Sequence, residues 1–184
     1  MTTLTATTAK TKWNLDASHS EVNFKVKHLM ITNVSGSFGK FDIQTQTDGN
    51  DFTSAEITFT ANTSSISTNS EQRDGHIKSG DFFDVENFPE MTFVSTSLTK
   101  KDEENYELAG NLTIKDITKP VKLHVEFGGL GIDPWGQQKA GFSVSGKINR
   151  TEWNLNWNSA LETGGFLLGD DVKIFAEIQL IKEA

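Results

Sequence analysis

Short segments in which apolar and polar residues alternate recur along the chain, and they restrict the possible folds more than any other feature. In residues 172–180 every second residue is aliphatic, while Lys173, Glu177 and Gln179 lie between them. Residues 22–28 show the same period of two. Because successive side chains of a β-strand point to opposite faces, this period predicts strands with one buried and one solvent-facing side.

Turn-forming residues divide the chain into about eight or more such segments. The strongest turn is Asp-Gly-Asn-Asp at residues 48–51, and further turns or irregular stretches are expected at residues 115–120 and 128–136. Gly39, between Phe38 and Phe41, predicts a β-bulge. Many short strands of this kind predict an all-β fold, either an antiparallel barrel or a sandwich. A membrane barrel would alternate with its apolar side outward, and the short strands favour a barrel whose apolar side faces inward.

Residues 64–93 form the one long interruption of this pattern, and charged residues stand beside aromatic ones there. Thr68, Asn69 and Ser70 offer side-chain oxygens that cap a helix N-terminus, and Pro89 ends any helix before the next strand. The segment therefore predicts a short helical insertion near residues 69–88. If the rest of the chain is a barrel, this insertion is expected to close one end.

Charge and composition exclude several classes of function. The chain has 17 basic and 25 acidic residues, a net charge of −8, and no basic run, so we expect no nucleic-acid partner. It has no cysteine, which removes disulfides and thiolate sites. The four histidines are far apart without ligand-like spacing, so neither a metal site nor a cofactor is expected.

The N-terminal residues 1–12 are polar and rich in threonine, and we expect a flexible arm before a single domain over residues 13–184. The chain shows no apolar run of a signal peptide and no stretch long enough to span a membrane. We therefore expect a cytoplasmic protein that does not span the membrane.

Motifs spread in order from Trp13 to the C-terminus resemble the YceI-like family. They are His-Ser-Glu-Val-Asn-Phe-Lys-Val-Lys-His at residues 19–28, Val-Ser-Gly-Ser-Phe at 34–38, the stretch 68–84 with Phe88-Pro89, and shorter matches in 112–121, 141–150 and 164–172. The stretch 68–84, Thr-Asn-Ser-Glu-Gln-Arg-Asp-Gly-His-Ile-Lys-Ser-Gly-Asp-Phe-Phe-Asp, matches the most specific motif of that family.

This resemblance implies a lipocalin-like antiparallel β-barrel of about eight strands. It also implies that the barrel holds a long-chain amphiphile, such as a polyisoprenoid, a prenyl quinone, or a fatty amide or acid. Transport, storage or sequestration would then be the role, without catalysis. Many members of the family carry an N-terminal export signal, and this sequence shows no such signal.

On composition alone the inward-facing residues would be ordinary core, and the resemblance makes them candidates for an apolar lumen. The expected lumen residues are Val22, Phe24, Val26, His28, Phe38, Ile57, Phe59, Ile77, Phe82, Phe83, Met91, Phe93, Leu112, Leu123, Val125, Phe127, Phe142, Val144 and Ile174. We call the helical insertion near residues 69–88 the lid. Arg73, Asp74 and Arg150 are the candidates for contact with the head group of a ligand or for fixing this lid. Arg73 and Asp74 suit either role, because a guanidinium binds anionic head groups and the pair could equally hold the insertion by ion pairs and hydrogen bonds.

Two other functions remain open at this point. One is an enzyme acting on a lipid or quinone with His28, Arg73 and Asp74, and the other is a ligand-free, stress-related interaction module with a filled core. A catalytic triad of Asp16, His19 and Ser20 is not expected, because residues so close along one strand do not reach triad geometry. Phe175 and Ile181 interrupt the polar face of the last strand and suggest a homodimer.

Overall fold

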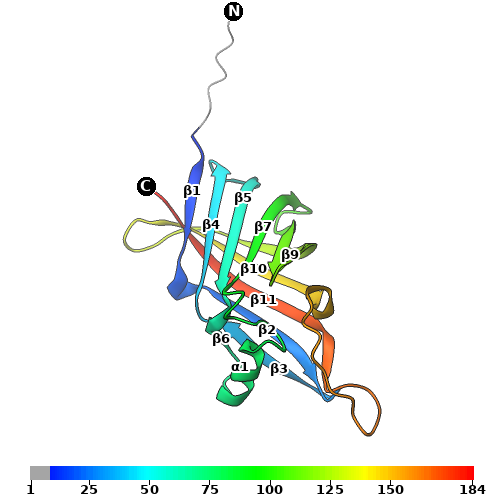
Figure 1. Ribbon diagram of the computed structural model, residues 1–184. Coiled ribbons are helices and arrows are strands. Elements are labelled where there is room, and N and C mark those ends of the chain that lie inside the picture. Colours follow the sequence, from blue (N-terminus) through cyan, green and yellow to red (C-terminus); the bar gives the residue numbers. More distant parts are fainter. Residues whose placement is uncertain (1–8) are drawn as a thin grey trace, which may run out of the picture.

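The computed structural model describes residues 9–184, and it is built almost entirely from strands (Figure 1). The strands are β1 Thr11–Leu15, β2 Glu21–His28, β3 Thr32–Phe38, β4 Phe41–Asp48, β5 Asp51–Asn62, β6 Ile66–Ser67, β7 Glu90–Lys100, β8 Asn105–Ile114, β9 Ile117–Ile132, β10 Gln138–Asn149 and β11 Leu168–Lys182. The α-helix is α1 Glu71–Lys78, and the 3₁₀-helices are η1 Ala17–His19, η2 Thr63–Ser65 and η3 Arg150–Trp153. β1 begins inside the arm expected over residues 1–12, and residues 1–8 of that arm lie outside the described residues.

Within residues 9–184, the strands form one antiparallel sheet that closes on itself. The order is β1-β4-β5-β7-β8-β9-β10-β11, and β1 pairs again with β11 to complete a ring of eight strands. β2, β3 and β6 continue the sheet from β11 beyond the ring. This arrangement confirms the predicted all-β antiparallel barrel and rules out the sandwich.

The first six strands are the halves of three long strands, each broken into two parts: β1 and β2, β3 and β4, and β5 and β6. β1 pairs with residues 180–182 of β11 and β2 pairs with residues 168–177 of the same strand, so both are halves of one strand interrupted by η1. The chain likewise bends at Gly39–Lys40 between β3 and β4, and η2 separates β5 from β6. The bulge predicted at Gly39 is therefore wrong, because this glycine joins two strands that have different neighbours.

An aromatic plug fills the end of the ring away from β2 and β3, and we define it as Trp13, Phe52, Phe127 and Phe142. The indole Nε1 of buried Trp13 donates to Thr47 Oγ1 at 2.9 Å, and its ring lies 5.1 Å from that of Phe52. Phe52 in turn lies 5.4 Å from Phe127 and 5.1 Å from Phe142. Paired aromatic rings of this kind bury a large area, so this end of the barrel is closed.

The insertion between β6 and β7 folds as predicted. Ser70 caps α1 by accepting from the backbone N–H of Arg73, and Gly75 is accommodated inside the helix. Turns then lead to Pro89, and β7 begins at the next residue. In Figure 1 the helix lies below β6, next to β2 and β3, where the ring of eight strands has ended.

Two segments expected to be irregular belong largely to β9. The turn predicted at 115–120 is only two residues, Lys115 and Asp116, and Lys115 takes the left-handed conformation with φ of 58°. Pro120 is tolerated in β9 because the ladder with β10 extends only to His124, so no second partner needs its missing N–H. Residues 128–132 also belong to β9.

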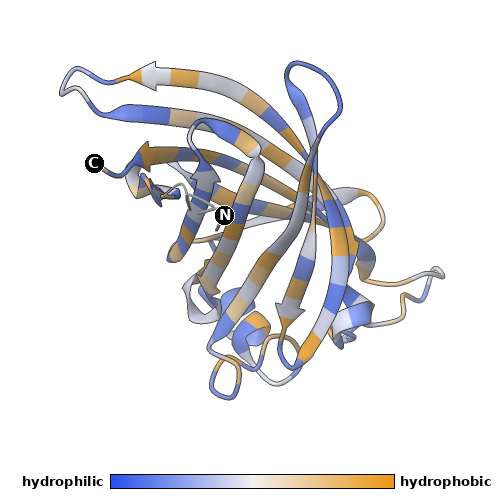
Figure 2. Ribbon diagram, turned by 90° about the horizontal axis from the view of Figure 1, so that it is seen from above, coloured by the Kyte–Doolittle hydropathy of each residue, from blue (hydrophilic) through white to orange (hydrophobic). Residues whose placement is uncertain are grey.

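Bands of hydrophobic and hydrophilic residues alternate along the strands in Figure 2, as the period of two requires. Among the described residues, no helix has the length and apolar character needed to cross a bilayer.

Candidate ligand cavity

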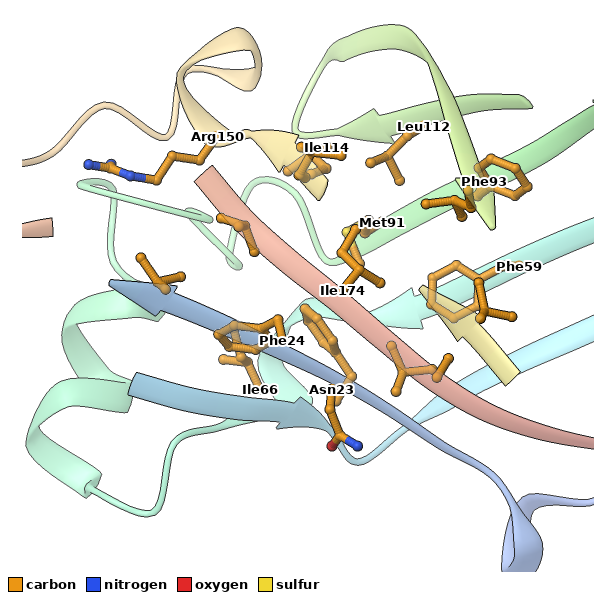
Figure 3. A pocket seen from close by; sticks show the side chains of 18 of the residues that line it. Asn23, Phe24, Phe59, Ile66, Met91, Phe93, Leu112, Ile114, Arg150 and Ile174 are labelled. Atoms are coloured by element: carbon orange, nitrogen blue, oxygen red, sulfur yellow. The ribbon is translucent and has the colours of Figure 1, made fainter. Parts of the chain in front are cut away.

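The barrel encloses a cavity of about 730 Å³ between the aromatic plug and the helical insertion (Figure 3). An eight-stranded barrel is just wide enough to hold one small ligand, and this volume lies in the usual range of ligand pockets. A core completely filled by side chains would not leave a space of this size.

All of the expected lumen residues except Phe127 line the cavity. They are Val22, Phe24, Val26, His28, Phe38, Ile57, Phe59, Ile77, Phe82, Phe83, Met91, Phe93, Leu112, Leu123, Val125, Phe142, Val144 and Ile174. Figure 3 shows Phe24, Phe59, Leu112 and Ile174 from four strands, with Met91 and Phe93 from a fifth, around the same space. Whether these side chains contact a ligand stays a prediction.

Phe127 and Asp74 are the two candidates that do not line the cavity. Phe127 stacks on Phe142 with ring centroids 5.1 Å apart, and it therefore belongs to the aromatic plug. The Asp74 carboxylate instead bonds to the segment that precedes its own helix.

The deep part of the cavity is apolar. Its wall includes buried side chains such as Ile43, Phe52, Leu98 and Leu108, and Ile148 lines the cavity nearer to η3; the prediction had missed all five. Ile43, Leu108 and Ile148 follow the same alternation as their predicted neighbours, so the period of two could have identified them. Thr45 is a polar exception, and its buried Oγ1 has no hydrogen-bond partner.

Apart from Thr45 and Asn23, the polar lining residues gather at the other end, toward α1. Gln72 and Arg73 are exposed to solvent and yet line the cavity, and Ser70, His76 and His28 are half-buried there. This distribution places the mouth of the cavity between α1 and the β2–β3 hairpin. The site is thus an apolar tube that ends in a polar mouth.

Thr68 joins the lid to the end of β6 through Arg73 and Asp74. Asp74 Oδ1 accepts from the backbone N–H of buried Thr68 at 2.8 Å and from its hydroxyl at 2.6 Å. Arg73 donates through Nε to the Thr68 hydroxyl and through Nη2 to the Thr68 carbonyl, both at 2.7 Å. The two charged side chains are therefore bonded to one threonine.

His76 packs the lid against the loop that follows η3. Its ring lies 4.5 Å from the Trp157 ring and 5.2 Å from the Phe82 ring, in edge-on arrangements. Its Nε2 lies 2.8 Å from Asp81 Oδ2. Trp157 lies in a segment without regular secondary structure, so the period of two could not have predicted that it lines the cavity.

Arg150 is buried and holds three segments of backbone together. Its guanidinium donates to the carbonyls of Leu155, Trp157 and Gly169. Nη2 is enclosed by protein without a hydrogen bond and lies 3.8 Å from Asp170 Oδ1. Burial lowers the pKa of this guanidinium. In Figure 3 the group points away from the apolar side chains of the lumen, so the geometry fits a clamp better than a head-group contact.

The neighbourhood of Asp16 and His19 does not have the geometry of a catalytic triad. Asp16 Oδ2 and the Ser18 hydroxyl both lie on the same imidazole nitrogen, Nδ1 of His19, at 2.9 and 3.1 Å. A triad needs the serine on the opposite nitrogen. Ser20 instead donates to the Gln179 carbonyl.

Asp16 is also held by Lys139, whose Nζ lies 2.5 Å from Oδ2. This hydrogen bond, with those of Ser18 and His19, holds the pKa of buried Asp16 well below its usual range. The described residues contain no group of three or more histidines and carboxylates placed to hold a metal ion.

The comparisons with known proteins agree with one another. The model of the YceI-like domain family matches residues 13–180. A UPF0312 protein of Staphylococcus epidermidis is 48% identical over 170 residues, which cover 92% of this chain and 96% of that protein. The crystal structure of the YceI protein of Campylobacter jejuni superposes with a TM-score of 0.75 at 32% identity, covering 92% of this chain and 97% of that one.

A third neighbour is a polyisoprenoid-binding domain from Saccharophagus degradans that is implicated in plant cell wall breakdown. It has a TM-score of 0.69 at 11% identity and covers 93% of this chain and 98% of its own. At this identity the likeness concerns the fold.

Proposed function

The chain belongs to the YceI-like domain family, and from that premise we propose that it binds a long-chain amphiphile inside its barrel. A polyisoprenoid, a prenyl quinone, or a fatty amide or acid has the required chemistry. Binding would serve transport, storage or sequestration, and the bound molecule would leave unchanged.

The observation that carries this proposal is the gradient of polarity along the cavity. An apolar chain would occupy the deep part, where its burial removes hydrocarbon from water at about 0.8 kcal/mol per carbon. Ordering a flexible chain and losing its translational freedom offset much of that gain. A polar head would remain among Gln72, Arg73 and the half-buried residues of the mouth, where it keeps its hydrogen bonds. The polyisoprenoid-binding domain of similar fold is consistent with such a ligand.

The arrangement of the candidate catalytic residues gives less support to an enzyme. Arg73 and Asp74 both bond to Thr68, and among the described residues no hydrogen bond joins either of them to His28. A positioned acid or base needs such contact with its partner or substrate.

The direct test is organic extraction of natively purified protein followed by mass spectrometry, together with uptake of a prenyl quinone and a fatty amide by the delipidated protein. We expect a long-chain amphiphile in the extract and recovery of each probe unchanged. Absence of any lipid together with no uptake of either probe would overturn the proposal.

A matched pair of variants locates the binding. Ala176 is buried on β11 and lines the cavity, whereas the next residue, Glu177, is exposed on the outer face. Ala176→Phe should fill part of the lumen and abolish uptake, while Glu177→Phe should leave uptake unchanged. Circular dichroism of both variants establishes that the barrel has formed. Equal uptake by the two variants would place binding outside the barrel.

A further inference from the structure

The tip of the β2–β3 hairpin presents three apolar side chains to solvent. Leu29, Met30 and Ile31 are 40%, 63% and 76% exposed. Leu29 and Met30 also take the left-handed conformation, with φ of 51° and 62°. Glycine and asparagine adopt that conformation readily, whereas larger side chains do so at a cost in free energy. This tip therefore carries exposed apolar residues at positions where small or polar ones would fold more easily.

The loop that precedes β11 lies beside this tip, and Figure 1 shows the two together at the lower right. The Leu29 backbone N–H donates to the Leu167 carbonyl at 2.8 Å. Met30 Sδ occupies the space over Gly165 where a side chain would otherwise lie. Phe166, next in that loop, is 59% exposed. We define Leu29, Met30, Ile31 and Phe166 as the apolar lip.

The apolar lip adjoins the lining of the cavity. His28, directly before Leu29, lines the cavity, and so do Leu167 and Leu168, directly after Phe166. On the side of Leu167 and Leu168, apolar surface thus continues from the lumen wall to the outside, while the polar residues of the mouth belong to α1 and its surroundings. A hydrocarbon chain leaving the cavity here would pass from one apolar surface to another.

The outer face of the strands that lead to the lip carries opposed lysines. Lys25 is the direct cross-strand partner of Lys173, and Lys173 is that of Lys147. Like charges directly opposite each other destabilise a sheet, so this row is not explained by folding. Lys27 lies two residues closer to the lip on β2.

In the described part of the chain, three of the lysines near the lip have no acidic partner, although several acidic residues lie close to the row. Asp171 pairs with Lys147 at 3.4 Å, and Asp170 lies 3.8 Å from the Arg150 guanidinium. Lys25 lies over the Phe175 ring at 5.5 Å. Within residues 9–184 the ion pairs formed by lysines include none of Lys25, Lys27 or Lys173. The loop before β11, residues 154–167, contains one acidic residue, Glu162. These lysines stand out on a chain whose net charge is −8.

We propose that the apolar lip and the lysines behind it dock on the surface of an anionic lipid bilayer. Side chains of the lip would enter the boundary between head groups and acyl chains, and the lysines would face the anionic head groups. Docking would place the mouth of the cavity at the membrane, where an amphiphile enters or leaves. The purpose of docking rests on the proposed function, but the docking itself needs no ligand in the barrel.

Vesicle flotation with delipidated protein tests this directly. We expect the protein to float with phosphatidylcholine vesicles that contain phosphatidylglycerol, and to float several-fold less with phosphatidylcholine alone. The double variant Met30→Asn, Ile31→Asn should lower the bound fraction roughly tenfold. It should also fold well, because asparagine suits the left-handed position of Met30.

The matched control is Trp135→Asn. Trp135 is 82% exposed on the β9–β10 hairpin, at the opposite end of β11 from the lip. This variant removes an equally exposed apolar side chain and should float like the unchanged protein. The docking proposal would be overturned by failure of the unchanged protein to float, by equal flotation with both kinds of vesicle, or by equal effects of the two variants. Prenyl-quinone uptake by the delipidated protein in detergent, measured separately, reports on the cavity whatever the flotation result.

Discussion

The ring of Phe24 lies directly over Gly36, its cross-strand partner, and fills the space that a β-carbon at position 36 would occupy. Phe93 and Leu123 likewise fill the space over Gly110 and Gly146 on neighbouring strands, although Phe93 is the direct partner of Leu112 and lies diagonally to Gly110. All three large side chains line the cavity. Because a glycine lies beneath each of them, they rest against the wall of the barrel instead of extending across it. These glycines therefore help to set the width of the lumen.

We predict that Gly36→Ala will narrow the lumen. The added methyl group would force the end of the Phe24 ring inward, since a β-carbon and the ring cannot share that space. We expect a loss of stability of about 1–2 kcal/mol and a marked loss of affinity for long-chain probes, greatest for the bulkiest. Titration of prenyl quinones of different chain length measures the effect.

Gly131→Ala is the control for this prediction. Gly131 also lies in a strand, but a β-carbon there would meet no atom within 4 Å. Its affinity for every probe should equal that of the unchanged protein. If Gly36→Ala also binds the longest probe normally, glycine does not determine the width of the lumen.

We predict that Asp74→Ala will loosen the lid. The change removes both hydrogen bonds from Thr68 to Asp74, and because α1 contains no buried residue, only the Arg73 bonds and the packing of His76 remain to hold it. We expect about 1–2 kcal/mol less protection of the α1 amides from hydrogen exchange, and faster release of a bound probe.

Glu71→Ala removes another acidic residue from the first turn of α1 and provides the control. Glu71 is exposed, so its loss should change hydrogen exchange only slightly. Equal loosening by both variants would mean that helix charge, and not the link to Thr68, holds the lid.

Alternation placed most of the expected lumen residues on the cavity side of their strands, but it carries no information on depth along the barrel. Phe127 shows this limit. It points inward like Val125, but it lies two residues closer to the plugged end and stacks on Phe142 instead of lining the cavity. The breaks between β1 and β2 or between β3 and β4 depend on which strand is the neighbour, and that is decided by distant parts of the chain.

The polar candidates illustrate a second limit. Arg150 and Asp74 could be selected by residue type, but their orientation depends on the carbonyls and amides that surround them. Three carbonyls direct the Arg150 guanidinium away from the lumen, and Thr68 draws the Asp74 carboxylate to β6. The homodimer suggested by Phe175 and Ile181 stays a prediction. Phe175 is exposed on the outer face of β11, whereas Ile181 is half-buried and pairs with β1 and β10.

We predict that Arg150→Lys will destabilise the barrel by about 3 kcal/mol although the charge is kept. A lysine ammonium cannot reach three separate carbonyls as a planar guanidinium does, so buried acceptors lose their partners. Urea unfolding measures the change. Arg73→Lys, at an exposed site, should cost less than about 1 kcal/mol, and equal costs at the two positions would contradict the clamp.

The last prediction concerns pH and the ion pair of buried Asp16 with half-buried Lys139. Hydrogen bonds, first from Lys139 and then from Ser18 and His19, lower the pKa of Asp16 from its ordinary value of 3.8. A carboxyl whose pKa is lower in the folded state stabilises that state fully above the ordinary value, and the contribution is lost as the pH falls through the folded pKa. The free energy of unfolding should therefore decline below about pH 4.

Asp16→Asn should be less stable at neutral pH by about 2 kcal/mol and should show a flatter decline. Lys139→Met should flatten the decline of the free energy of unfolding over the same pH interval, because it removes the main cause of the low pKa of Asp16. Urea unfolding at a series of pH values measures all three proteins, and a decline in Asp16→Asn as steep as that of the unchanged protein would assign the acid sensitivity to other carboxylates.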